Sequence, residues 1–353
     1  MFTLHKLGRV VQSLADAHIT KAKRRRFHLG IELCAFREFT SLNSAGRLLG
    51  IGRFTGEARM RRMAHDNALG NSLQRMLLHE GFGGRSGQCF CSLDHSQFGC
   101  FCIAVLAVSH RKGRAIPIWV QVNVSEAALI KPLLAALEEL FVVIGRIAGA
   151  MQLVLVMDRW FASDRLFTLF EEYGILFIAR TKGDKLIQLP WDPSWWKEPI
   201  ADISHEELEI TYHSHRLRLV RSDFRDDMKG NEPWFLLTNI PDRDTLHPEG
   251  IGLTRRQILN RYTERFEIEE AFKDIKWLNR LKWQSIRKPE AIRNLLLFVV
   301  LGWWLLWRYG DTHEQRMNRR THPKKRLGWY RVAWEQLQAA VQAQVHIQLH
   351  LQS

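Results

Sequence analysis

The spacing of apolar residues divides the chain into a helical first part and a later part of short strands and helices. Leu4–Ala17 carries apolar residues at helical spacing, and residues 1–75 as a whole favour helices. From Cys89 onward, apolar runs of strand length alternate with amphipathic runs of helix length. We expect strands at 89–94, 100–109, 115–124, 151–157 and 175–180, with helices at 127–145 and 162–173.

The order of these elements indicates the fold class. Three strands joined by short turns come first, followed by helix, strand, helix and strand. Met151–Met157 is apolar throughout, as expected for a parallel strand buried on both faces. Pro117 cannot donate a backbone hydrogen bond, so the third strand is predicted to lie at a sheet edge. This succession is the order of a ribonuclease H-like core, an α/β fold.

A β-rich segment interrupts this core before the chain returns to helix near Thr254. Leu295–Trp307 is apolar but, at 13 residues, too short to span a bilayer, so it predicts a buried helix. A last amphipathic helix is expected from about Gly328. The predicted parts are a helical, basic N-terminal domain (1–78), the first part of the core (88–182), a β-rich insertion (183–242), further core helices (250–310) and a basic helical C-terminal region (311–353).

Positive charge is concentrated near the beginning of the chain. Lys and Arg number 51 against 37 Asp and Glu, which gives a net charge of +14. Residues 1–75 alone hold fourteen Lys and Arg against five Asp and Glu. This balance favours a polyanionic partner, nucleic acid before a membrane surface. The first residues lack the apolar core of a signal peptide, and five cysteines without a secretion signal favour reduced thiols in a cytoplasm.

The N-terminal domain shows a pattern typical of a helix-turn-helix. Residues 21–26 are predicted to be a charged connector, and Thr40–Leu49 a short helix that starts at a Ser/Thr cap. Glycines then precede a basic helix at Thr55–Asp66. We expect this domain to bind DNA, with phosphates contacted by Arg59, Arg61 and Arg62. The alternative is a solvated helical cap.

Two further patterns are assigned ordinary structural roles. Residues 80–88 are rich in glycine and predict a flexible linker, because a phosphate-binding loop would end in Lys-Ser or Lys-Thr. The pairs Cys89/Cys91 and Cys100/Cys102 could form a zinc site. Neighbouring strands whose alternate residues share a face are the favoured interpretation.

The segment Tyr262–Lys276 is rich in helix formers and predicts a helix with a charged stripe. At about 100° per residue, Tyr262, Arg265, Glu269 and Lys276 fall on one narrow face, beside an apolar face. On spacing alone, a salt-bridged surface stripe is an equally good interpretation.

Two aspartates upstream change that balance. Asp94 and Asp158 are each predicted to end an apolar strand, where side chains of neighbouring strands meet in one cleft. Together with Glu269 they make three carboxylates. If these converge they repel one another, and divalent cations relieve this repulsion. Hard oxygen ligands suit Mg²⁺, and two ions about 3.5–4 Å apart support an in-line displacement. We therefore expect a site for two Mg²⁺ ions, with Mn²⁺ able to substitute.

With these residues in order, the chain resembles bacterial insertion-sequence transposases of the DDE class, in particular the IS-four type with a Tyr-Arg-Glu-Lys signature. Tyr262, Arg265, Glu269 and Lys276 match that signature without a gap. The family's aspartate motifs resemble SLDHSQF around Asp94 and VMDRWFAS around Asp158. Residues 59–71 and 234–241 are similar to the family's basic N-terminal segment and to the strand that leaves its β-insertion.

The resemblance implies a role for each matching residue. Asp94, Asp158 and Glu269 are expected to be the metal-binding catalytic triad. Arg265 and Lys276 are expected to hold phosphates beside the cut, and Tyr262 to contact the DNA end. Arg180 and Lys182 match a family Arg-x-Lys position for the DNA backbone; solvated strand-end charges are the alternative. Trp234 matches a tryptophan that stacks on a flipped base in relatives that use a DNA hairpin, although a strand Trp is also typical of a core.

The resemblance also implies the activity and the partners. We expect metal-dependent cleavage at the ends of an insertion element and transfer of the freed 3′-OH into target DNA, whether or not a hairpin intermediate intervenes. The partners are double-stranded DNA, both terminal repeats and target, and a second copy of the chain; no membrane is involved, and a nucleoid-associated location is expected. One alternative is another ribonuclease H-like nuclease or resolvase. The other is a catalytically inactive DNA-binding inhibitor of transposition.

Overall fold

The structure is a computed structural model, which describes most of the chain between residues 4 and 317. The described residues are 4–31, 33, 45, 50–98, 100–110, 114–124, 130–149, 151–192, 196–222, 233–243, 252–269, 271–272 and 286–317. Lys276, most of the helix predicted at Thr40–Leu49 and the helix predicted from Gly328 lie outside these residues.

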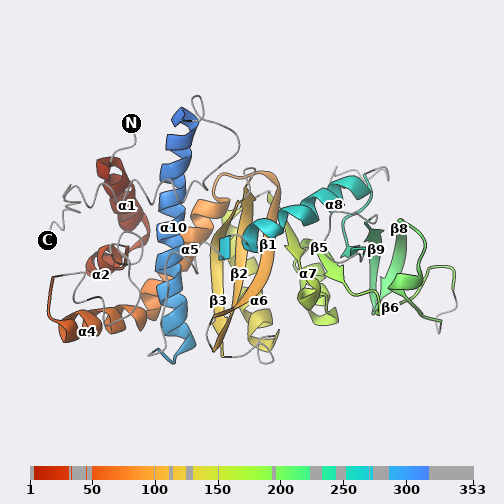
Figure 1. Cartoon of the computed structure of the whole chain (residues 1–353), viewed down its shortest axis with the longest axis horizontal. Coiled ribbons are helices and arrows are strands. Elements are labelled where there is room, and N and C mark those ends of the chain that lie inside the picture. Colours follow the sequence, from red (N-terminus) through yellow and green to blue (C-terminus); the bar gives the residue numbers. More distant parts are fainter. Residues whose placement is uncertain are drawn as a thin grey trace.

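An eight-stranded mixed sheet forms the centre of the molecule (Figure 1). Its strand order is β3-β2-β1-β4-β5-β10-β9-β8. β1 and β4 are parallel, as are β4 and β5, and the other neighbours are antiparallel. The strands are β1 Gly87–Phe98, β2 Phe101–His110, β3 Arg114–Asn123, β4 Met151–Met157, β5 Leu176–Thr181, β8 Glu207–Tyr212, β9 His215–Arg221 and β10 Phe235–Thr238.

The strand predictions hold for the first five strands. β4 has the predicted bounds, and β3 lies at the sheet edge, with the register shift opposite Pro117 and Trp119. The segment predicted as an insertion contributes β8, β9 and β10, which extend the same sheet beyond β5. A separate two-stranded sheet is formed by β6 Leu186–Ile187 and β7 Glu198–Pro199, followed by the 3₁₀ turn η3 Ile200–Asp202.

Helices cover both faces of the sheet. α6 (Ile130–Ile147) and α7 (Asp164–Glu172) pack on one face in a single core with Cys89, Cys91 and Leu93 of β1. Because side chains alternate along a strand, Asp94 points to the other face. That face is covered by α10 (Pro289–Met317), α5 (Asn67–Phe82) and α8 (Arg255–Glu264). The buried cysteines pack as core residues, and the described residues contain no cluster of three or more metal-ligand side chains.

The N-terminal helices pack on the far side of α10 from the sheet (Figure 1). They are α1 Leu4–His18, α2 Lys21–Ile31 and α4 Arg53–Ala64. The connector predicted at 21–26 is wrong: it is the first part of α2, which is anchored by buried Phe27 and Ile31. The linker predicted at 80–88 is shorter in the structure, since α5 ends at Phe82 and β1 begins at Gly87.

The helix α10 is apolar on every side because it lies between the N-terminal helices and the sheet. Its side chains from Leu295 to Leu305 are buried, apart from Gly302, which has none. The Asn294 side chain donates to the Ala64 carbonyl at 2.9 Å and so ties α10 to the end of α4. Within the part of the chain that the structure describes, no helix is long and apolar enough to cross a membrane.

Candidate active site

Asp94 lies within β1 rather than at its end, which corrects the sequence prediction. β4 stops opposite Leu93, so the next residue of β1 has a strand partner on one side only, Val105 of β2. β1 itself continues to Phe98. The Asp94 carboxylate therefore lies at the point where the parallel pairing of β1 and β4 ends, on the face covered by α8.

Asp158 follows the last residue of β4, as predicted. Its Oδ1 accepts a hydrogen bond from the Arg159 N–H at 2.8 Å and caps the 3₁₀ turn η2 Arg159–Phe161. Val154 and Val156 pack on the α8 side, so alternation along the strand directs Asp158 to the same face as Asp94. Burial is the main cause that raises the pKa of Asp94, and the charge of Asp158 adds to that rise.

The helix that carries the Tyr-Arg-Glu residues begins at a capping box. The Thr254 hydroxyl accepts from the Gln257 N–H, and the Gln257 side chain accepts from the Thr254 N–H at 2.9 Å. α8 then runs to Glu264. At Arg265 the backbone tightens, because the Ile268 N–H donates to the Arg265 carbonyl three residues earlier, at 3.0 Å. Helix resumes at residues 266–269, so the predicted helix is interrupted at Arg265.

Arg265 joins two of the three predicted ligands. Its Nη1 donates to Asp94 Oδ2 at 2.8 Å, and its Nη2 donates to Glu269 Oε1 at 2.9 Å. Arg265 is 4% exposed and Asp94 is 7% exposed. The residues that form the ion pairs are therefore also two of the predicted active-site carboxylates.

The charges at this site influence one another strongly. Burial raises the pKa of the Asp94 carboxyl, and the nearby Arg265 guanidinium opposes that rise. Burial by itself would lower the pKa of Arg265, but Tyr262, Asp94, Asp158 and Glu269 together raise it. The structure thus brings all three predicted triad carboxylates into the field of one guanidinium.

An aromatic cluster adjoins these charges. The Trp234 and Tyr262 rings lie 5.0 Å apart, and the Phe266 ring lies 5.9 Å from Trp234. Trp234 is 6% exposed and Tyr262 is fully buried, whereas Phe266 is 37% exposed. Burial is the main cause that raises the pKa of Tyr262 to about 12. The sequence predictions omitted Phe266, whose ring lies 4.9 Å from the Arg265 guanidinium; its position directly after Arg265 was the available signal.

The other predicted DNA-binding residues lie at two places. Arg180 is on β5 opposite Leu236, and its charge, like that of Arg265, opposes the burial that raises the pKa of Tyr262. Lys182 is exposed just after β5. Arg59, Arg61 and Arg62 lie on α4, beyond α10 and away from the carboxylates (Figure 1).

A comparison with known protein families identifies the family of the chain. The family model described as "Transposase DDE domain" matches residues 94–305, which is more than half of the chain. The chain belongs to the DDE transposase family. The matched range begins at Asp94 and includes Asp158, Arg265 and Glu269. No curated protein matches the chain.

The donor chemistry of this transposase fits the divalent ions expected of its family. Asp94, Asp158 and Glu269 offer only carboxylate oxygens, the ligands that Mg²⁺ prefers. Two of these carboxylates already hold a cation, the Arg265 guanidinium. As they stand, no three His, Cys, Asp or Glu side chains among the described residues are arranged to hold one metal ion.

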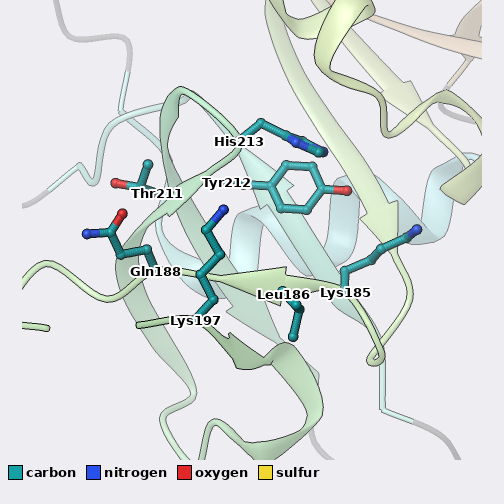
Figure 2. A pocket seen from close by; sticks show the side chains of 7 residues that line it. All are labelled: Lys185, Leu186, Gln188, Lys197, Thr211, Tyr212 and His213. Carbon is teal, nitrogen blue, oxygen red and sulfur yellow. The ribbon is translucent and has the colours of Figure 1, made fainter. Parts of the chain in front are cut away.

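The transposase also has a cavity of about 260 Å³ at the β8 end of the sheet. Its lining side chains, drawn in Figure 2, come from β6 and the residues on either side of it, from the residue before β7, and from the end of β8 with the residue after it. The lining residues are Lys185, Leu186, Gln188, Lys197, Thr211, Tyr212 and His213. No carboxylate lines it, and Tyr212 belongs to the core on the α7 side of the sheet, so this cavity is not the predicted catalytic centre.

Proposed function

We propose that the protein is a DNA transposase that cleaves DNA at the ends of an insertion element and joins the freed 3′-OH to target DNA. The observation that carries this proposal is the arrangement of Asp94, Asp158 and Glu269 around Arg265, within a chain of the DDE transposase family. The IS-four assignment, the expected use of a dimer with DNA and the use of a hairpin are finer parts of the same proposal.

The three carboxylates have the task of holding the divalent ions. Asp94 is fixed by the sheet and by the His95 N–H, which donates to its Oδ1 at 2.8 Å. Asp158 is fixed by its cap on η2, and Glu269 comes from the helical residues after α8. Bound Mg²⁺ or Mn²⁺ supplies the Lewis acidity that activates the attacking oxygen and stabilises the leaving oxygen.

Cationic and aromatic residues have the task of positioning DNA. Arg265 contacts two of the carboxylates, Arg180 lies on β5 next to β4, and Lys182 is exposed just after β5. In this proposal they hold phosphates where charge develops on phosphoryl oxygens during displacement. Lys276 has the same role in this proposal. Trp234 would need to move from its buried place to stack on a flipped base, because its ring already packs against Tyr262.

The basic residues on α4 have the task of binding the element end. Arg59 is half-buried, Arg61 and Arg62 are exposed, and Arg61 forms an ion pair with Glu57 at 2.8 Å. Contacts of this kind with phosphates give binding that weakens steeply as salt concentration rises. Loss of these arginines is therefore expected to reduce end binding without changing the chemistry of the triad.

The deciding experiment incubates the full chain with Mg²⁺ and DNA that carries the repeats flanking its own gene, and sequences the products. We expect nicks at the repeat ends followed by strand-transfer products. Asp94→Ala and Glu269→Ala should keep end binding and lower cleavage by about 10³-fold or more, the effect of removing several kcal/mol of charge stabilisation. Cleavage that survives either change would falsify the triad assignment.

The same experiment separates the two rival functions. Nicks without strand transfer would identify another ribonuclease H-like nuclease or resolvase. End binding without any Mg²⁺-dependent cleavage would identify an inactive inhibitor of transposition, for which the basic residues of α4 suffice.

A further inference from the structure

The Arg265 guanidinium occupies oxygens that the proposed function assigns to a metal ion. It takes Asp94 Oδ2 at 2.8 Å and Glu269 Oε1 at 2.9 Å. Its charge is further stabilised by Asp158, so the whole triad contributes to holding it. While these contacts persist, the described side chains do not converge on a metal position. The guanidinium and a shared divalent ion therefore compete for the same carboxylates.

Arg265 also has unused hydrogen-bonding capacity on the same buried face. Among the described residues, neither its Nε nor the hydroxyl of the adjacent Tyr262 bonds to a third group, although Arg265 lies close enough to Tyr262 to oppose the rise that burial causes in the Tyr262 pKa. Buried donors without partners cost about 1–3 kcal/mol each, so such atoms call for an explanation. A phosphate group supplies several acceptor oxygens and pairs strongly with guanidinium. The resting contacts thus leave Arg265 with donors that a phosphate could take.

The backbone at Arg265 suits a change of partner. The residue lies between the end of α8 at Glu264 and the helical residues 266–269, where the hydrogen bonding tightens to a three-residue spacing. Such tightened stretches within helices are common at hinges. The Phe266 ring, which is 37% exposed, lies 4.9 Å from the guanidinium.

We propose that Arg265 is a switch that exchanges the triad carboxylates for a phosphate of bound DNA and so strengthens metal binding when DNA is present. This inference rests on the proposed function, which supplies the metal-binding triad. In the free protein the guanidinium neutralises Asp94 and Glu269. When a DNA phosphate accepts hydrogen bonds from Arg265, the released carboxylates repel one another, and this repulsion favours a divalent ion. DNA and metal then bind with positive coupling, by the same factor in either order.

The test measures Mn²⁺ binding to the full chain by calorimetry and electron paramagnetic resonance, with and without duplex DNA that carries the flanking repeats. Binding of Mn²⁺ to the duplex alone is subtracted. For the wild type, DNA should raise the Mn²⁺ affinity by at least about tenfold, within the usual range of coupling between sites. Arg265→Ala should raise the affinity of the DNA-free protein by a similar factor and abolish the effect of DNA.

A matched control removes one positive charge a turn earlier on the same helix. Arg261 pairs with Glu264 at 2.9 Å and stacks over the Phe90 ring at 4.1 Å, without contacting the triad. Arg261→Ala should therefore leave both the affinity and the coupling as in the wild type. Arg265→Lys keeps the charge but presents a single ammonium group in place of the two-pronged guanidinium, so it should give an intermediate coupling. Arg265→Lys replaces Arg265→Ala in the test if Arg265→Ala does not fold, as judged by near-ultraviolet circular dichroism.

Two triad variants distinguish the failure of this inference from failure of the proposed function. Asp158→Asn and Glu269→Gln should abolish Mn²⁺ binding to the DNA complex. If they bind Mn²⁺ like the wild type, the triad and with it the proposed function are wrong. If they lose Mn²⁺ binding while DNA leaves the wild-type affinity unchanged, or while the Arg265 variants keep full coupling, only the switch is wrong.

Discussion

Two buried arginines show how differently this protein uses the same side chain. Arg265, just after α8, lies over the centre of the sheet, and Arg218 lies toward its β8 end. Arg218 on β9 donates to the Ile240 carbonyl at 2.9 Å and the Leu253 carbonyl at 3.0 Å, and it pairs with Glu207. All three nitrogens of its guanidinium therefore have partners. Arg265 spans Asp94 and Glu269 but leaves its Nε without one.

The difference fits a structural role for Arg218 and, within the proposed function, a binding role for Arg265. Arg218 ties β9 to β8 and to the segment just before the Thr254 cap, so its contacts fix the entry to α8. Buried polar groups with complete partners rigidify a structure, whereas incomplete ones mark places where stability is given up for another purpose. The incomplete arginine lies among three carboxylates of the predicted triad, and the complete one does not.

The largest test of this comparison is Arg218→Ala. Loss of two buried carbonyl contacts and a partly buried ion pair should lower the free energy of unfolding by about 2–4 kcal/mol. Urea denaturation measures this effect, and added Mn²⁺ should not restore the loss, whereas it should stabilise Arg265→Ala. The control Arg216→Ala, at an exposed position of the same strand, should change stability by less than about 0.5 kcal/mol. Recovery of Arg218→Ala by Mn²⁺ would contradict the structural role.

The second test uses Tyr262, whose buried hydroxyl lacks a partner. Its pKa is raised to about 12 from an ordinary 10.0, so the folded state keeps the proton that the unfolded state loses first. The contribution of Tyr262 to the free energy of unfolding is therefore fully present below pH 10 and is lost as the pH rises through about 12. Relative to Tyr262→Phe, the wild type should lose about 2–3 kcal/mol over that window. Paired urea denaturation curves at pH 8, 10, 11 and 12 measure the difference, of which about 1.4 kcal/mol should be present at pH 11.

At neutral pH, Tyr262→Phe should change the stability of the free protein by less than about 1 kcal/mol, because among the described residues only the adjacent Arg265 side chain interacts with this hydroxyl, and without a well-formed hydrogen bond. Weaker binding to the element end by the same variant would assign the hydroxyl to DNA. A clear loss of stability at neutral pH would instead show that Tyr262, like Arg218, has a structural partner.

The smallest effect is expected at the cap of α8. Thr254→Ala removes the capping box and should cost about 1 kcal/mol in the free energy of unfolding. Thr254→Ser keeps a hydroxyl and serves as the matched control. Because Arg218 holds the adjacent Leu253 carbonyl, the double variant with Arg218→Ala should lose less than the sum of the two single losses. Additive losses would show that the Arg218 contacts and the Thr254 cap act independently.

Much of the site could be predicted from the sequence because its parts are local. The apolar run that ends before Asp158 gave β4 with its observed bounds. The four-residue spacing of Arg265 and Glu269 placed both on one side of a helix, and the structure pairs them. Asp94 was found through its motif, but its place within β1 was wrong, since nothing in the local pattern shows where a neighbouring strand stops.

The sequence by itself determined the class of the elements from β1 to β5, the charged stripe and the resemblance to DDE transposases, the family whose model matches the chain. Only the tertiary structure decided that β8, β9 and β10 extend the central sheet, and that Arg265 reaches across 171 residues of sequence to Asp94. The physical reason is that periodicity is encoded within a few residues, whereas strand pairing and buried ion pairs depend on which distant segments come together. The same reason explains why the carboxylates could be predicted but their present cation could not.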